Sequence, residues 1–286
     1  MSFAETALLG ALAGFTIFLS LPFGRITTMS NRSRVALAMF AVGVLVFLLV
    51  DIFEHALELV EGPVEELAGD GGGLGTAIGY VLLLGGGFAA GTAGLATLER
   101  WMRPDPGPLP PIAGGSVDAL TVEEAERLTG DADGHRKRAL QLGMTIATAI
   151  GLHNFAEGLA IGVSASTGEI ALATVLIIGF GLHNATEGFG IVGPLGSVRP
   201  SWTWLGVAGL VGGGPVFLGA LIGYNVTSQP LELAFYGLSG GAILYVIGEV
   251  WNGMRRYGHR ELGLWMLSAG FICGVVTDLI VVYGGG

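Results

Sequence analysis

Charge and cysteine are both scarce in this chain of 286 residues. Only 13% of the residues are charged, against about a quarter in a typical soluble domain. Cys273 is the single cysteine, which excludes an internal disulfide and any metal site built from several thiolates. With an apolar fraction of 51% and a mean hydropathy of +0.68, the composition indicates a membrane protein and excludes an ordinary soluble one.

What the chain has instead is a series of long apolar stretches. A helix needs about 20 apolar residues to cross the hydrocarbon core of a bilayer, and stretches of that length occur eight times. The sequence therefore predicts an all-α membrane protein with eight transmembrane helices. We place the eight spans at 4–24, 35–60, 74–98, 139–164, 170–192, 203–225, 231–253 and 261–283.

The basic residues are confined to the connections that follow spans 1, 3, 5 and 7, whereas the opposite side carries only acids. With eight spans, the four basic connections share one side of the membrane. Basic connections face the cytoplasm under the positive-inside rule. We therefore expect a multi-pass protein of the inner or plasma membrane, with both termini outside the cytoplasm.

The longest polar segment, 99–138, divides the spans into three, two and three. We expect helices 1–3 within 1–98, a cytoplasmic loop at 99–138, a central pair at 139–192 that carries the metal site, and helices 6–8 within 193–286. A capping-box pattern predicts a short helix near 121–129 in the loop. The 3+2+3 division permits an inverted repeat, with two sets of three helices around the central pair.

Two nearly identical hexapeptides lie inside the central pair of spans, HNFAEG at 153–158 and HNATEG at 183–188. Each offers an imidazole and a carboxylate four residues apart, which places both groups on one face of a helix. Both motifs fall near the middle of antiparallel neighbouring spans, so their faces can meet. A carboxylate at that depth costs about 2.5–3.5 kcal/mol, so it is a functional-site candidate by default.

The two motifs predict a divalent metal site between the central spans. Mixed imidazole and carboxylate ligands suit Zn²⁺, Fe²⁺, Mn²⁺ or Co²⁺ and disfavour Cu⁺. The alternative is that these side chains only hydrogen-bond to one another as packing groups of the bundle. The expected metal site consists of His153, Glu157, His183 and Glu187, with Asn154 and Asn184 one step around each helix.

Further ionisable residues lie nearer the membrane surfaces. Asp51 and His55 share one stripe of span 2, and we predict that they first bind an incoming ion. Glu54 and Glu58 on the same stripe would form a negative mouth that attracts cations. Glu249, near the cytoplasmic end of span 7, is predicted to bind the departing ion. The alternatives are a solvated interfacial stripe on span 2 and an ordinary bundle-facing acid on span 7.

The chain resembles the ZIP family of divalent-metal transporters, the zinc- and iron-regulated permease relatives, and its prokaryotic branch in particular. The resemblance rests on the two HNxxEG motifs, on the glycine- and leucine-rich run at 214–223 and on YVIGE at 245–249. It implies a 3+2+3 bundle in which spans 4 and 5 build a transport site, often binuclear, that moves as a core against the other helices. By this likeness the primary site matches His153, Glu157, His183 and Glu187, and the secondary site matches Asn154, Asn184 and the two glutamates.

Three departures from the family pattern bear on the site. Ala156 and Thr186 stand where the family commonly has a proline before the glutamate, so we expect straighter helices. Gly214 stands where a glutamate usually precedes the proline of span 6, which removes a ligand from the secondary site. The cytoplasmic loop has His135 in place of a histidine cluster, so we do not expect this loop to sense metal.

The function predicted from these features is that of a transporter and not an enzyme. It would move a divalent ion, foremost Zn²⁺, into the cytoplasm by elevator-type alternating access, with Fe²⁺, Mn²⁺, Co²⁺ or Cd²⁺ as other candidate cargoes. The expected partners are the metal ion and the lipid bilayer, a homodimer is left open, and no nucleic acid is expected. Two alternatives remain, a metal-dependent intramembrane hydrolase in which the ion activates water and a metal sensor that binds without transport.

Overall fold

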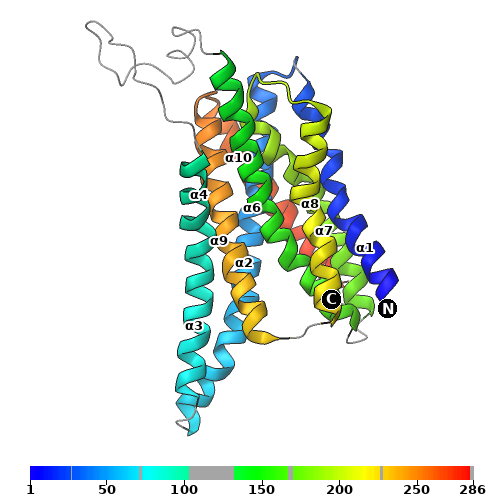
Figure 1. Cartoon of the computed structure of the whole chain (residues 1–286), viewed down its shortest axis with the longest axis vertical. Helices are drawn as coiled ribbons and strands as arrows, with labels where there is room; N and C mark the ends of the chain where they lie inside the picture. Colours follow the sequence, from blue (N-terminus) through cyan, green and yellow to red (C-terminus); the bar gives the residue numbers. More distant parts are fainter. Residues whose placement is uncertain (27, 71–72, 103–131, 167–169, 226–227, 284–286) are drawn as a thin grey trace, which may run out of the picture.

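The structure, a computed structural model, describes residues 1–26, 28–70, 73–102, 132–166, 170–225 and 228–283. Long helices lie side by side in one bundle, and the described residues contain no strand (Figure 1). The helices are α1 (Phe3–Phe15), α2 (Asn31–Asp70), α3 (Leu74–Ala89), α4 (Leu95–Met102), α6 (Ala132–Ser166), α7 (Ile170–Val192), α8 (Trp202–Asn225), α9 (Gln229–Arg255) and α10 (Arg260–Tyr283). Turns of 3₁₀ helix follow α1 (Thr16–Leu19, Leu21–Arg25) and α7 (Gly193–Leu195), and a π turn (Ala90–Gly94) joins α3 to α4.

The predicted all-α membrane fold is confirmed. Seven helical stretches of the described residues are long and apolar enough to cross a membrane, judged by length and composition. The remaining predicted span, 170–192, coincides with α7. The inverted repeat stays a prediction. Most of the expected loop at 99–138, including the short helix near 121–129, lies outside the described residues.

α2 is much longer than the span predicted at 35–60, because the helix continues to Asp70 at the end of the bundle. Hydropathy marks only the apolar part of a helix. The additional turns contain Glu61, Glu65 and Glu66, which are exposed, and glutamate is a good helix former in water. Pro63 lies within this extension and does not end the helix.

The first predicted span, 4–24, is by contrast not a single α-helix. α1 ends at Phe15, and two 3₁₀ turns carry the chain to Arg25. Pro22 stands near the start of the second turn, where its missing N–H group is tolerated. The turns direct Ile17 and Leu21 into the core, where both are fully buried.

The two ends of the bundle differ in charge. Glu61, Glu65 and Glu66 extend beyond one end, which we call the acidic end, where α2 ends and α9 begins. Every arginine and lysine among the described residues lies at the opposite end, the basic end, where α8 and α10 begin. α1 begins and α10 ends at the acidic end (Figure 1), as an even number of spans requires.

α1, α6, α7 and α8 pack together as a first helix group. α6 lies along most of α8, and glycines allow the two backbones to touch. A Cβ atom on Gly158 would overlap the backbone of Val216, and one on Gly219 would overlap the backbone of Phe155. α1 meets α8 in the same way at Gly14, and α7 packs against α1 and the turns that follow it.

α2, α3, α9 and α10 pack together as a second helix group. Gly43 of α2 lies against the backbone of Leu267 in α10, and Gly237 of α9 lies against the backbone of Leu84 in α3. Among the described residues, each glycine whose Cβ would overlap the backbone of another helix meets a helix of its own group. The two groups therefore meet through side chains, within one buried apolar core.

Replacing Gly219 with alanine should lower the stability of the bundle. The added methyl group has to displace the backbone of α6, and overpacking of this kind typically costs about 1–3 kcal/mol. Gly206 lies in the same helix, and a Cβ there meets nothing within 4 Å. Gly206→Ala should therefore be neutral or stabilising by up to about 1 kcal/mol. Thermal unfolding of both variants in detergent measures the difference, and equal melting temperatures would contradict the close packing of α6 on α8.

Candidate metal-binding site

The two hexapeptide motifs face each other in the interior of the bundle, one on α6 and one on α7. The histidine, asparagine and glutamate side chains of both motifs have exposed fractions of 8% or less. Charged groups are rarely buried to this extent without partners. The buried set consists of His153, Asn154, Glu157, His183, Asn184 and Glu187.

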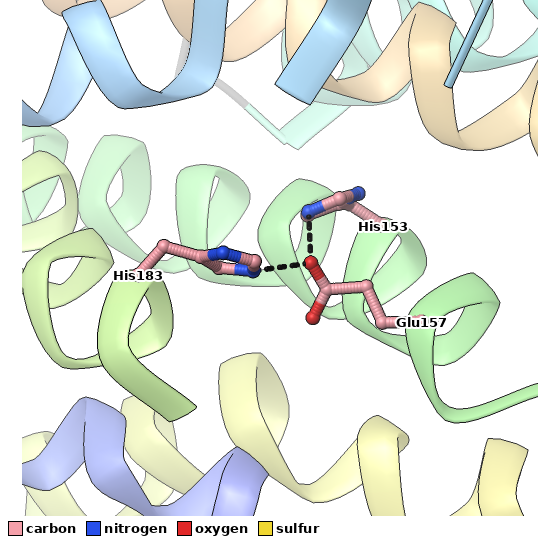
Figure 2. A group of neighbouring side chains, drawn as sticks. All are labelled: His153, Glu157 and His183. Carbon is pink, nitrogen blue, oxygen red and sulfur yellow. Dashed lines mark hydrogen bonds and ion pairs between the residues drawn. The ribbon is translucent and has the colours of Figure 1, made fainter. Parts of the chain in front are cut away.

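The carboxylate of Glu157 lies between the imidazoles of His153 and His183 (Figure 2). Its Oε1 atom is 2.5 Å from Nε2 of His183 and 2.9 Å from Nε2 of His153. One ligand atom from each residue lies within 4.8 Å of the other two, which is close enough for all three to bind one metal ion. The i, i+4 spacing on α6 places two of these groups on one face, and α7 supplies the third.

Glu187 of α7 lies beside this cluster and contacts two residues of α6. Its Oε1 atom is 3.8 Å from Nε2 of His153, and its Oε2 atom accepts a hydrogen bond of 3.0 Å from Nδ2 of Asn154. Asn154 also donates to the backbone carbonyl of Gly212 in α8, at 3.0 Å. Asn184 donates to the carbonyl of Ala13 in α1, at 3.4 Å. The two asparagines therefore tie the motif helices to the rest of the first helix group.

The site has more acceptor atoms than donors. Four of its buried oxygens have no hydrogen-bond partner: Oε2 of Glu157, Oε1 of Glu187, and Oδ1 of Asn154 and Asn184. Buried polar atoms without partners are uncommon because desolvation is costly. A cation satisfies such oxygens directly or through its bound water, so the surplus of acceptors favours a positively charged ligand.

Ser239 of α9 was not predicted from the sequence, and it contacts the site directly. Its Oγ atom lies 3.0 Å from Nδ1 of His153, and the side chain is fully buried. A serine hydroxyl both donates and accepts, so it supports either tautomer of the imidazole. When Nε2 binds a cation, Nδ1 carries the proton and donates to Ser239. In the sequence, Ser239 is only a single hydroxyl residue within the glycine-rich run 237–241. That pattern does not indicate that its side chain contacts a histidine.

A cavity of about 430 Å³ leads from the site toward the acidic end. His153, Glu157 and His183 form its inner end, and residues of α2, α6, α7, α9 and α10 line the rest of the wall. No arginine or lysine among the described residues lines it. A cleft with walls of one charge raises the local concentration of oppositely charged ions. The carboxylates of the wall are Asp51, Glu54, Glu58, Glu157, Glu232 and Asp278.

Comparison with known proteins also supports a site for a metal cation. The profile of the family described as ZIP Zinc transporter matches residues 116–247, which include both motifs. A zinc transporter ZupT of Clostridium perfringens is 25% identical over 85% of this chain and 84% of its own length. A second ZupT, of Streptococcus mutans, is 22% identical over 96% of this chain and 97% of its own length. The chain is similar to the ZIP family of zinc transporters along most of its length.

Two further relatives match a shorter part of the chain. The zinc transporter ZIPB of Bordetella bronchiseptica is 28% identical over 57% of this chain and 53% of its own length. The zinc transporter GufA of Myxococcus xanthus is 31% identical over 51% of this chain and 59% of its own length. These bacterial relatives agree with the prokaryotic branch inferred from the motifs.

Asp51 and His55 lie in the wall of the cavity and not in the buried cluster. Nδ1 of His55 is 2.9 Å from the backbone oxygen of Asp51 and 3.9 Å from its carboxylate. The side chain of His55 is 54% exposed and that of Asp51 is 29% exposed, so an ion in the cavity can reach both. Asp278 of α10 lines the same cavity, and tertiary packing alone brings it opposite α2. Their roles as ligands stay predictions.

Glu249 lies apart from the cluster. It is ten residues beyond Ser239 on α9, which corresponds to about 15 Å along a helix. It is half-buried and does not line the cavity that reaches the motifs. Binding of a departing ion at Glu249 therefore stays a prediction, and it would require a conformation in which the site opens toward the basic end.

Gly214 of α8 lies where the family pattern has a glutamate. A Cβ at this position meets nothing within 4 Å, so no other side chain fills the space. The Oδ1 atoms of Asn154 and Asn184 have no hydrogen-bond partner. Both residues match the family's secondary site. Occupation of that site in this chain would depend on these amides and the two glutamates.

Replacing Ser239 with alanine should weaken Zn²⁺ binding by about 10- to 100-fold, the range found when a residue that orients a metal ligand is removed. The imidazole of His153 would lose the partner that fixes its ring orientation. Ser268 of α10 is a matched control, because it is exposed and bonds only to its own helix. Isothermal titration of the purified variants with Zn²⁺ measures the effect. Equal affinities for the two variants would exclude a positioning role for Ser239.

Proposed function

We propose that the protein transports Zn²⁺, or a chemically similar divalent cation, across the membrane into the cytoplasm. The observation that carries the proposal is the convergence of two imidazoles and two carboxylates at the inner end of an acidic cavity. Each bacterial relative that we compared is a zinc transporter by name. The donor set suits Zn²⁺ and leaves Fe²⁺, Mn²⁺, Co²⁺ and Cd²⁺ as further candidates, whereas Cu⁺ prefers sulfur ligands.

The proposed direction follows from the charges at the two ends. Under the positive-inside rule the basic end faces the cytoplasm, so the cavity opens away from it. A cation would enter between the acids of α2, α9 and α10 and reach the buried cluster. This arrangement supports uptake from outside, with both termini on the outer side.

The way from the site to the basic end is closed by apolar side chains. Ile150 and Ile146 lie on α6 about one and two turns before His153, respectively, and both are fully buried. Ile243 and Val246 lie on α9 beyond Ser239, and they belong to the same buried core. A hydrated ion cannot cross this layer while it stays packed. Release to the cytoplasm therefore requires a change in how the helices are arranged.

An elevator-type movement is the rearrangement that the packing favours. Backbone contacts at glycines join α1, α6, α7 and α8 into one group, and the same kind of contact joins α2, α3, α9 and α10. The motif residues belong to the first group, so the group can carry the bound ion past the second one. The contact between His153 and Ser239 crosses between the groups and would break during the movement.

Transport in reconstituted vesicles tests the function. Wild-type protein should accumulate Zn²⁺, detected by a fluorescent indicator inside the vesicles, and Glu157→Ala and His183→Ala should abolish accumulation because each removes a buried ligand. Glu261→Gln is the matched control, because it removes a carboxylate from an exposed position of α10. Zn²⁺ binding without any flux would favour the sensor, and Zn²⁺-dependent cleavage of lipid or peptide would favour the hydrolase.

Cross-linking the two helix groups tests the movement. A Cβ on Gly193, directly after α7, would lie 2.9 Å from the Cβ of Ala38 in α2. Disulfide-linked Cβ atoms are about 3.5–4.5 Å apart, so a small shift allows the bond. In a Cys273→Ser background, oxidation of Gly193→Cys/Ala38→Cys should stop Zn²⁺ flux, and reduction should restore it.

The control cross-link lies within the first helix group. A Cβ on Gly10 of α1 would lie 2.7 Å from the Cβ of Ala220 in α8. Oxidised Gly10→Cys/Ala220→Cys should keep its Zn²⁺ flux, because both helices move together. Full flux with the bond between Gly193→Cys and Ala38→Cys closed would rule out a relative movement of the two groups at this point.

A further inference from the structure

A second cavity of about 400 Å³ lies at the basic end, far from the motifs. It is formed by the first turns of α2, the last turns of α9 and the first turns of α10. None of its lining residues belongs to the metal cluster or to the cavity at the acidic end. Its lining combines basic side chains with an apolar wall, and the proposed transport does not account for either.

The basic part of the lining consists of Arg255, His259 and Arg260. All three are exposed, and none of their side chains forms an ion pair with a described carboxylate. Arg256 next to them is engaged, since it donates to the carbonyl of Pro194 at 2.8 Å and lies over the ring of Tyr257. The two arginines of the cavity are therefore available to an external anion.

The turn between α9 and α10 brings the two arginines to the same cavity. Gly258 has a φ of 71° and His259 a φ of 56°, both in the left-handed region. Glycine adopts this region freely, and histidine adopts it more readily than most residues. Two successive left-handed residues reverse the chain within a few positions, so Arg255 ends one helix and Arg260 begins the next at the same cavity.

The remaining lining is apolar and continues to the outside of the bundle. Val35 and Met39 of α2 and Trp251 of α9 form the inner wall. Gly263 allows α10 to approach α2, since a Cβ there would lie 3.4 Å from Cγ of Met39. Leu264 lines the cavity and is 42% exposed, so the apolar surface extends from the cavity to the outer face of α10.

The cavity lies at the level expected for lipid headgroups. Tryptophan is enriched where the hydrocarbon core meets the polar headgroups. All five tryptophans of the chain lie at helix ends on the basic side of the bundle. Basic pockets between transmembrane helices on the cytoplasmic side bind anionic headgroups. The five residues are Trp101, Trp202, Trp204, Trp251 and Trp265.

We propose that this cavity binds one anionic phospholipid, with its phosphate between Arg255 and Arg260 and an acyl chain along the apolar wall of α2 and α10. The charge of the arginines selects an anionic headgroup, and His259 can donate a further hydrogen bond. The apolar wall selects a lipid over a soluble phosphate compound. The lipid would bind helices of the second group only, so the site would persist while the first group moves.

Native mass spectrometry of the full-length protein in a neutral detergent tests the proposal. Phosphatidylglycerol and phosphatidylcholine with identical acyl chains are added at equal concentrations. The wild type should retain one phosphatidylglycerol per chain with a preference of about tenfold or more. Arg255→Gln/Arg260→Gln should lose this preference, whereas Arg255→Lys/Arg260→Lys should largely keep it, because the charge remains.

Arg100→Gln/Arg199→Gln is the matched control, because it removes two exposed arginines from the same end of the bundle and outside the cavity. It should retain the preference. If both glutamine double variants lost the preference for phosphatidylglycerol equally, the preference would come from the overall charge of this end of the bundle. That result would overturn the proposed site.

Two further results would also overturn the proposal. One is equal binding of phosphatidylglycerol and phosphatidylcholine by the wild-type protein. This result does not depend on any variant, so it would overturn the proposal even if a variant failed to fold. The other is full displacement of phosphatidylglycerol by inorganic phosphate or glycerol phosphate, which would assign the cavity to a soluble anion. The lipid experiment requires no Zn²⁺, so its failure leaves the proposed transport unaffected.

Discussion

One carboxylate oxygen shared by two imidazoles is the interaction on which the interior of this bundle depends. Glu157 is buried at mid-bundle, where an isolated charge is costly, and His153 and His183 approach it within 2.9 Å or less. The same desolvation that penalises an unpaired carboxylate strengthens its attraction to any cation that enters. Stability and cation binding therefore depend on the same atoms.

Glycine packing determines which helices are joined most closely to this cluster. Close backbone contact requires residues without side chains, and such contact is rigid because interiors are packed as densely as crystals. The contacts place both motif helices with α1 and α8 and leave Ser239 on the opposite group. The hydrogen bond between His153 and Ser239 thus joins the two helix groups, and in the proposed elevator movement it is a contact between the moving and the static group.

The two ends of the molecule serve different purposes because their charges differ. Acids at one end line a cavity that leads to the cluster, and they favour cations at its mouth. Arginines and tryptophans gather at the other end, where a lipid headgroup finds both charge and an apolar wall. The positive-inside rule then relates both features to the orientation of the protein in the membrane.

The sequence by itself determined the helices, because hydropathy and helix length are local properties of the chain. It also determined the cluster, because matched i, i+4 spacings on antiparallel neighbours leave few other ways to bury two carboxylates. The partner of His153 at Ser239, the place of Asp278 in the cavity wall and the division into two helix groups were decided by the tertiary structure alone. Each of these depends on how helices distant in sequence are rotated and placed against one another, and a nearly uniform apolar pattern with many glycines leaves that choice to packing.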